Sequence, residues 1–237
     1  MEKSITWGAL LLEDLEHLMA QYGVDPHPAI DALVVSVLLI VFAFFAGRKF
    51  RQTDMLEPEG RLSLAFVAEW SISLLLGIFE SVIEHGARKY FFILGTFGFF
   101  ILGNNLMGLV PGFNPPTDQF NVTIVLALIT FITAHFIGIT HHGFAYVKKF
   151  MGPIWWMAPL IFPIEVISHL VRPLSLSIRL FGNMTGDHKV VLIFSTLVPL
   201  AIPAVFMGLG IFISFLQAFV FILLSAVYFQ DALDHPH

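Results

Sequence analysis

The sequence predicts an all-α, polytopic membrane protein, with about five membrane-embedded helices, an amphipathic interfacial helix and a long, steeply tilted helix hairpin near the C-terminus. Three observations support this prediction. Of the 237 residues, 57% are hydrophobic and only 12% are charged, about half the charged fraction of a soluble domain. Apolar runs of spanning length recur along the chain, separated by turn residues and charges. One arginine, Arg179, stands inside such a run, in the motif SLSIRLFGNM.

The first part of the single membrane domain (1–237) divides at its turn residues and charges. Residues 1–27 form an outer N-terminal segment whose apolar positions fit a short interfacial helix. Residues 29–47 are an apolar run of spanning length, and the basic cluster at 47–51 is typical of a cytoplasmic end. We expect residues 52–88, an amphipathic loop on the cytoplasmic side, to lie on the membrane or among helices rather than cross.

Two further spans and a hairpin follow. Residues 90–110 form the second span, and the loop PGFNPPTDQF after it carries no Lys or Arg, so we expect this loop to face outward. Residues 122–142 form the third span, and Lys148-Lys149 marks its cytoplasmic end. Residues 161–229 form the tilted hairpin. This order places the N-terminus outside and the C-terminus in the cytoplasm.

The segment from Pro163 to Leu197 is too long to cross a bilayer upright. About 35 helical residues would reach roughly 50 Å, whereas the hydrocarbon core is about 30 Å thick. Either the helix breaks near Arg172-Pro173, or it lies steeply tilted. Spacings of three and four favour a continuous, tilted helix, because they place seven polar residues on one face: Glu165, Ser168, Arg172, Ser175, Arg179, Asn183 and Asp187. Such a face must meet protein or water.

A second, weaker stripe of small and polar residues runs along one face of the last span, Ala204–Phe229. Its members share one helical face: Gly210, Ser214, Gln217, Phe221, Ser225 and Tyr228. If the two helices are antiparallel, Gln217 comes near the arginine stripe. The second span adds Asn104-Asn105, and the third adds His135.

The composition excludes several classes of function. A net charge of −5 gives no basic surface for nucleic acid. The absence of Cys excludes disulfides, thiolate metal sites and thiol nucleophiles. No GxxxxGK[ST] phosphate loop occurs, so we do not expect the chain to catalyse ATP chemistry itself. We expect neither a cofactor nor a metal.

Four segments resemble one known family, subunit a of the membrane sector of bacterial F-type ATP synthases. The run PLSLSIRLFGNM (Pro173–Met184) is highly specific to it. LQAFVFILLSAVYF (Leu216–Phe229), GNNLMGLVPGF (Gly103–Phe113) and NVTIVLALITF (Asn121–Phe131) agree mainly in order and spacing. The resemblance covers nearly the whole chain except about the first 25 residues.

The resemblance implies a proton-conducting stator in the bacterial inner membrane. Its partners would be a rotating ring of hairpin subunits that carry a membrane carboxylate, the peripheral-stalk subunits b, the lipid bilayer and, indirectly, the catalytic head. Two offset half-channels would load and unload the ring carboxylates, and Arg179 would separate them. Proton is the default ion, and sodium stays open.

Topology and the family motifs assign residues to each half-channel. The cytoplasmic set precedes the arginine: Glu165, Ser168, His169 and Ser175. The outer set contains Asn183, Asp187, His188, Gln217, Asn105 and His135. The resemblance maps the family glutamine onto Gln217 and the asparagine four residues past the arginine onto Asn183.

The outer path departs from the family pattern. His188 stands where many bacterial relatives carry glutamate, Gly210 stands at the partner position on the last helix, and Gly108 replaces a common acid. We hypothesise that Asp187 with His188, aided by His135, replaces the missing acid–histidine pair.

Several other interpretations of these residues are open. Glu165 and Arg172 could form interfacial salt bridges instead of lining a channel. The Ser175 hydroxyl could hydrogen-bond only to its own helix backbone. His135 could be a hydrogen-bonded residue of the core and not a proton carrier. For the whole chain, the alternatives are a membrane redox subunit that binds haem or quinone, suggested by ten histidines, and a non-conducting assembly scaffold.

Overall fold

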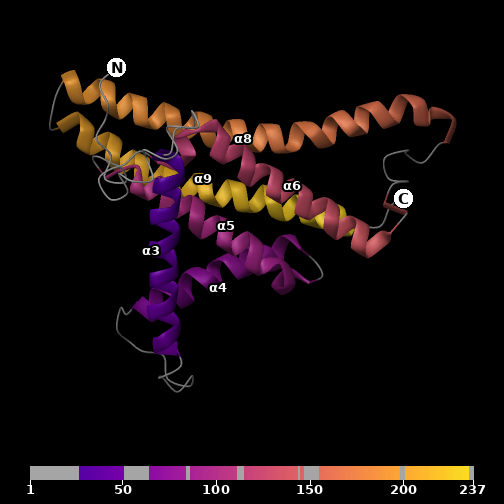
Figure 1. Ribbon diagram of the computed structural model, residues 1–237, viewed down its shortest axis with the longest axis horizontal. Helices are drawn as coiled ribbons and strands as arrows, with labels where there is room; N and C mark the ends of the chain where they lie inside the picture. The colour runs from indigo at the N-terminus through magenta and orange to yellow at the C-terminus, as the bar shows by residue number, and fades with distance from the viewer. Residues whose placement is uncertain are drawn as a thin grey trace, which may run out of the picture.

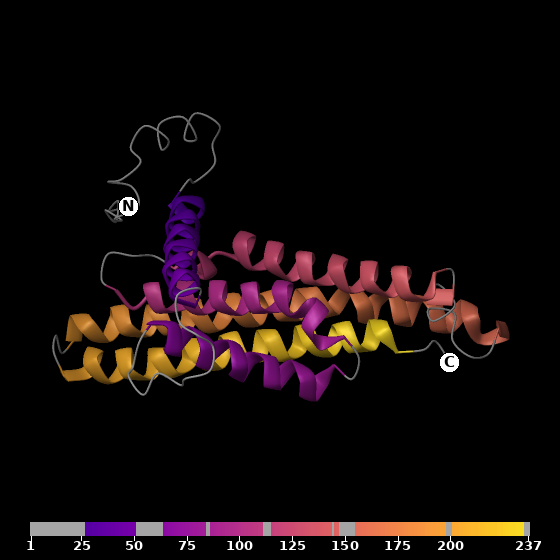
Figure 2. The same ribbon diagram turned by 90° about the horizontal axis from the view of Figure 1, so that it is seen from below.

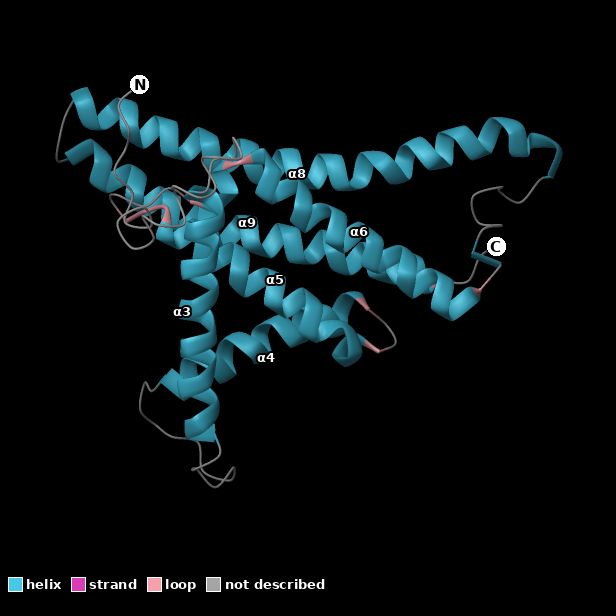
Figure 3. Cartoon of the chain, viewed as in Figure 1, coloured by secondary structure: helices cyan, strands magenta, loops and turns pink. Residues whose placement is uncertain are grey.

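The computed structural model describes residues 27–50, 64–83, 86–110, 115–143, 145–146, 155–197 and 201–234. Residues 1–26 of the segment predicted to hold the interfacial helix, residues 52–63 and 84–85 of the predicted 52–88 loop, and Lys148-Lys149 lie outside the described residues. Within the described part of the chain, all regular structure is helical, which confirms the all-α prediction (Figure 3).

Six α-helices and two short 3₁₀ turns make up the described structure. In chain order they are α3 (His27–Phe50), α4 (Leu64–Val82), α5 (Ala87–Met107), η1 (Pro116–Asp118), α6 (Phe120–His142), η2 (Trp155–Met157), α8 (Ala158–Leu197) and α9 (Ala201–Leu233). Five segments of these described helices are long and apolar enough to cross a membrane: Ala29–Arg48, Ala87–Met107, Phe120–His142, Ala158–Val191 and Val205–Leu233. The prediction of a polytopic membrane protein is therefore confirmed.

The long helix α8 does not break. It runs for 40 residues with Pro163 and Pro173 inside it, which amounts to a length of about 60 Å. A helix this long fits a hydrocarbon core of about 30 Å only when it is steeply tilted. Figures 1 and 2 show α8 and α9 running side by side as a hairpin, whereas α3 crosses their direction.

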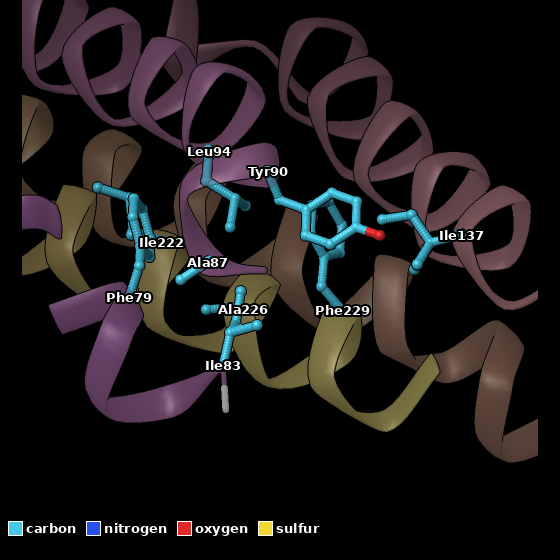
Figure 4. Packing of buried hydrophobic residues seen from close by; sticks show 10 residues of the cluster. Phe79, Ile83, Ala87, Tyr90, Leu94, Ile137, Ile222, Ala226 and Phe229 are labelled. Carbon is cyan, nitrogen blue, oxygen red and sulfur yellow. The ribbon is translucent and has the colours of Figure 1, made fainter. Parts of the chain in front are cut away.

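The helix α4, which begins beyond the masked loop, packs among the other helices. Phe79 is fully buried, and Ile83, just past the end of α4, is 1% exposed. Both belong to a core cluster with residues of α5, α6 and α9, such as Leu94 and Phe229 (Figure 4). The turn that leads into α5 uses Gly86 at φ 84°, a left-handed conformation that favours glycine.

The outward surface is apolar over most of its helices. On α3, for example, Ile40 is 67% exposed and Phe44 is 61% exposed. An exposed apolar surface of this extent suits lipid or partner helices rather than water. Polar groups that interrupt it, or that lie buried beneath it, are therefore candidates for function.

Candidate functional site

The helix α8 presents three faces along the segment that contains Arg179. One face is buried against α6, α9 and η1, and includes His169, Pro173, Leu176, Leu180 and Met184. A second face is apolar and exposed, and includes Ile167, Leu170, Leu174 and Ile178. Between these two faces runs a polar flank on which Arg179 and Asn183 are both exposed. The guanidinium therefore points out of the helix bundle formed by this chain.

No described carboxylate forms an ion pair with Arg179. A permanent cation on an outward face within a membrane costs roughly 3 kcal/mol even on lenient insertion scales. Arginine also keeps its charge at any physiological pH. A negative charge brought next to this position would therefore be strongly favoured.

One turn after Arg179, a hydrogen bond joins the two helices of the hairpin. The Asn183 side-chain amide donates to Gln217 Oε1 on α9 at 2.7 Å. Gln217 is 3% exposed, and it lies on the buried face of α9 with Gly210, Ser214 and Ser225. The sequence predicted that the two polar stripes would meet near the arginine, and this contact confirms that part of the prediction.

A group of polar residues, here called the turn-side cluster, gathers between this bond and the turn of the hairpin. Three hydrogen bonds define it: Asn183 with Gln217, Thr185 with Asp118, and Thr117 with Asn105. The name also covers Asn104, Asp187 and His188, which are close to these residues in sequence. Asp187 is half-buried, and its carboxylate lies against Gly210, where an added Cβ would be 2.8 Å from Oδ2. His188, the next residue, is also half-buried.

Two neighbouring asparagines line the buried side of the turn-side cluster. Asn104 and Asn105 are both fully buried, and the Thr117 hydroxyl donates to Asn105 Oδ1 at 2.8 Å. Asn104 Oδ1 and Asn105 Nδ2 have no partner among the described protein atoms. Buried polar atoms of this kind normally have a hydrogen-bond partner, either a protein group or an ordered water. This part of the bundle is therefore polar enough to be wet.

The sequence analysis missed Asp118, which accepts a hydrogen bond from the Thr185 hydroxyl. Asp118 ends the turn η1, 67 residues before its partner. No local pattern signals such a contact, because it depends on how η1 packs against α8. Gly108 has no room for the acid common in the family, since an added Cβ would lie 2.7 Å from Pro115 Cγ and 2.9 Å from Met184 Cε.

A second group, here called the open-end cluster, lies toward the open end of the hairpin. It contains His135, Tyr146, Glu165, His169, Arg172, Tyr228 and Asp231, and most of these residues line one small pocket. Arg172 Nη1 bonds Asp231 Oδ2 at 2.5 Å, and its guanidinium lies 5.4 Å from the centre of the Tyr228 ring. Arg172 thus forms the salt bridge that the sequence left open. Its partner, Asp231, belongs to α9.

One contact joins residues that were predicted for different half-channels. His135 was assigned to the outer set, but its ring centre lies 5.5 Å from that of His169, which belongs to the cytoplasmic set. His135 reaches His169 because it lies far along α6, about 22 Å from the start of this helix at Phe120. Two other members of the cytoplasmic set behave differently: Ser168 is exposed, and Ser175 donates to its own helix backbone at Arg172 O, 3.0 Å away.

An apolar layer separates the turn-side cluster from the open-end cluster. It consists of buried residues of α5, α6, α8 and α9: Ile101, Leu126, Ala127, Leu176, Leu180, Ala218 and Phe221. Thr123 and Ser177 share a buried hydrogen bond of 2.9 Å between α6 and α8 beside this layer. Arg179 stands between Leu176 and Leu180 in sequence, so it is level with the layer but faces outward.

Comparison with known proteins identifies close relatives over almost the whole chain. Residues 31–230 match the model of a family described as "ATP synthase A chain". "ATP synthase subunit a" of Trichlorobacter lovleyi is 44% identical over 223 residues, which are 94% of each chain. "ATP synthase subunit a" of Geobacter sulfurreducens is 47% identical over 207 residues, 87% of this chain and 89% of the relative. "ATP synthase subunit a 1" of Pelobacter propionicus is 43% identical over 227 residues.

Proposed function

Because this chain belongs to the ATP synthase A chain family, we propose that it is the proton-conducting stator subunit of a rotary ATP synthase. In this proposal it provides two offset half-channels, one on each side of the membrane, that load and unload carboxylates on a rotating ring. One observation carries the proposal: an apolar layer separates two polar clusters, and Arg179 faces outward at the level of that layer. In this proposal, a proton that moves from one cluster to the other passes along the outer surface of α8.

The arginine can control the charge of a passing carboxylate. A carboxylate that faces lipid must be protonated, because its charged form is too costly there. Beside Arg179 the charged form is favoured, so the carboxylate releases its proton. A fixed positive charge also blocks direct proton transfer between the two half-channels. The transmembrane potential supplies about 2.3 kcal/mol per proton per 100 mV, and leakage past Arg179 would waste this drive.

The turn-side cluster is proposed as the outer half-channel. Asn183 and Gln217 would form its inner end, and Asp187 with His188 would carry protons in place of the acid–histidine pair that the family usually has. Asn105 would hold water at its wall. Asp118 joins this proposal because its carboxylate bonds Thr185 in the same cluster.

The open-end cluster is proposed as the cytoplasmic half-channel. Glu165, Ser168, His169 and Ser175 were assigned to it from sequence, and the proximity of His135 to His169 supports moving His135 to this side. Ser168 lies on the same outward surface of α8 as Arg179. Ser175, two turns of helix from Ser168, would continue the polar surface toward the arginine.

The chain is proposed to sit in the bacterial inner membrane with its N-terminus outside and its C-terminus in the cytoplasm. The basic residue Arg48, near the end of α3, favours this orientation. The proposed partners are a carboxylate-bearing ring on the Arg179 face, the peripheral-stalk subunits b and, indirectly, the catalytic head. ATP chemistry would occur on that head and not in this chain. The redox-subunit and scaffold alternatives are not proposed further, since every relative reported above is named ATP synthase subunit a.

The decisive experiment reconstitutes the complete ATP synthase in vesicles and measures ATP synthesis driven by a proton gradient. We expect Arg179→Ala to abolish synthesis and Arg179→Lys to reduce it strongly, because lysine can lose its charge. Arg88→Ala is the matched control, since Arg88 forms a surface pair with Glu80 in which its side chain is 80% exposed. Normal ATP yield from Arg179→Ala, with the assembled complex present, would overturn the proposal.

A further inference from the structure

The open-end cluster contains two imidazole rings from different helices in edge-to-face contact. His135 on α6 and His169 on α8 have ring centres 5.5 Å apart and planes at 78°. His169 is 4% exposed, and His135 is half-buried. Both line a small pocket, together with Tyr146, Arg172 and Asp231. This pair lies about 15 Å along α8 from Arg179, because His169 precedes it by ten residues.

Backbone contacts determine which nitrogen of each ring accepts a proton. His135 Nδ1 is 2.9 Å from Phe131 O, and His169 Nδ1 is 3.0 Å from Glu165 O. A carbonyl oxygen can only accept a hydrogen bond, so each Nδ1 carries the hydrogen in these contacts. In both neutral rings Nε2 is then the basic nitrogen. The pair therefore offers two proton acceptors of the same kind, held by helices that pack against each other.

The charges around the pair limit how many protons it holds. Two imidazolium rings in contact would repel each other, and Arg172 adds a third positive charge nearby. The Glu165 carboxylate lies 3.5 Å from His169 Nδ1, and Asp231 pairs with Arg172. Glu165 and Asp231 together carry two negative charges and Arg172 carries one positive charge, so one added proton makes the group neutral. Tyr228 stacks on Arg172. Burial raises the pKa of the Tyr146 phenol, which therefore stays neutral.

From these contacts we infer that His135 and His169 act as one proton carrier that takes up a single proton between Arg179 and the cytoplasm. In each transfer one Nε2 accepts a proton and its ring becomes imidazolium, while the Nδ1–H stays on the backbone carbonyl. The same Nε2 then gives the proton to the other ring, directly or through one water. No bond other than the N–H changes. This inference rests on the proposed function, and it concerns positioning and transfer, not the separation performed by Arg179.

Asparagine is the sharpest substitution for each ring. Its side-chain amide nitrogen sits near the position of Nδ1 and keeps the bond to the backbone carbonyl, but nothing replaces the basic Nε2. Glutamine is the second variant, for use if an asparagine variant does not assemble, because its amide reaches the Nε2 position and still takes no proton. His141→Asn is the matched control, since His141 is exposed near the end of the same helix α6.

The experiment measures ATP synthesis by the complete complex in vesicles as a function of the pH on the ATP-forming side. We expect His135→Asn and His169→Asn each to reduce the rate about tenfold, less than a positioned acid–base group usually contributes because water substitutes in part. Each should also change the shape of the pH profile. The double variant should be no slower than the worse single one, since both rings serve one transfer.

Two results would overturn the inference: an unchanged pH profile in both single variants, or a loss in the double variant equal to the product of the two single losses. Arg179→Ala is measured in the same vesicles. If it abolishes synthesis while the histidine variants behave like His141→Asn, only the paired carrier is wrong. If Arg179→Ala makes ATP normally, the proposed function itself fails.

Discussion

The carboxylate of Asp187 on α8 occupies the space above the α-carbon of Gly210 on α9. A Cβ added at Gly210 would lie 2.8 Å from Asp187 Oδ2 and 2.7 Å from Leu109 Cδ2. Real Cβ atoms do not approach other atoms so closely, so Asp187 can hold this position only because residue 210 has no side chain. Glycine at position 210 thus leaves room on α9 for the Asp187 carboxylate of α8.

We therefore predict that Gly210→Ala displaces the Asp187 carboxylate and reduces ATP synthesis severalfold. Stability should fall by less than the roughly 1–3 kcal/mol usual for overpacking, because the nearest atoms are the ends of the flexible Asp187 and Leu109 side chains, which can move. Gly208→Ala is the matched control, because nothing lies within 4 Å of a Cβ at Gly208 on the same helix. It should be neutral or slightly stabilising, since alanine favours helix more than glycine does. Synthesis in vesicles and thermal unfolding of the purified complex measure both effects. Equal behaviour of the two variants would show that the contact with Asp187 is unimportant.

Asp187→Asn should reduce proton-driven ATP synthesis at least about tenfold, because an amide keeps the shape of the carboxylate but carries no proton between water and Asn183. His188→Ala should reduce it less if the neighbouring acid is the main carrier. Passive proton flow through the membrane sector, measured without the catalytic head, separates a loss of conduction from a loss of coupling. Normal synthesis from both variants would exclude the proposed outer path.

Breaking the bond between Arg172 and Asp231 should destabilise the hairpin more than breaking a surface pair. Asp231→Asn leaves the Arg172 guanidinium, whose side chain is 31% exposed, without its carboxylate. We expect a loss of about 1–2 kcal/mol, discounted for partial exposure. Glu80→Gln, which breaks the far more exposed pair with Arg88, should cost about 0.5 kcal/mol or less. Thermal unfolding of the two variants should therefore differ, and equal midpoints would contradict this.

The bond between Asn183 and Gln217 should couple the two helices energetically. In a double-mutant cycle with Asn183→Ala and Gln217→Ala, we expect an interaction energy of about 0.5–1.5 kcal/mol, typical of one interhelical hydrogen bond in a membrane protein. Thermal unfolding gives the four stabilities of the cycle. Strict additivity would mean that the two amides contribute independently, despite their 2.7 Å separation.

The sequence alone determined the class of the protein and the site of its permanent charge. Long apolar runs must be helical in lipid, because every backbone polar group has to be paired within the segment. The spacing of Glu165, Ser168, Arg172 and Arg179 therefore predicted one continuous, tilted helix, and α8 runs through Pro173 without a break. The motif around Arg179 pointed to the family, and the comparisons establish it.

Only the tertiary structure decided which polar groups meet. A sequence gives the depth and the face of a residue on its own helix, but contacts between helices depend on rotation and offset, which packing sets. Thus Asp118 reaches Thr185 across 67 residues, Asp231 pairs with Arg172, and His135 lies beside His169 instead of with the outer residues. The room above Gly210 is likewise a property of the packed hairpin, since an absent side chain matters only when a neighbour fills its place.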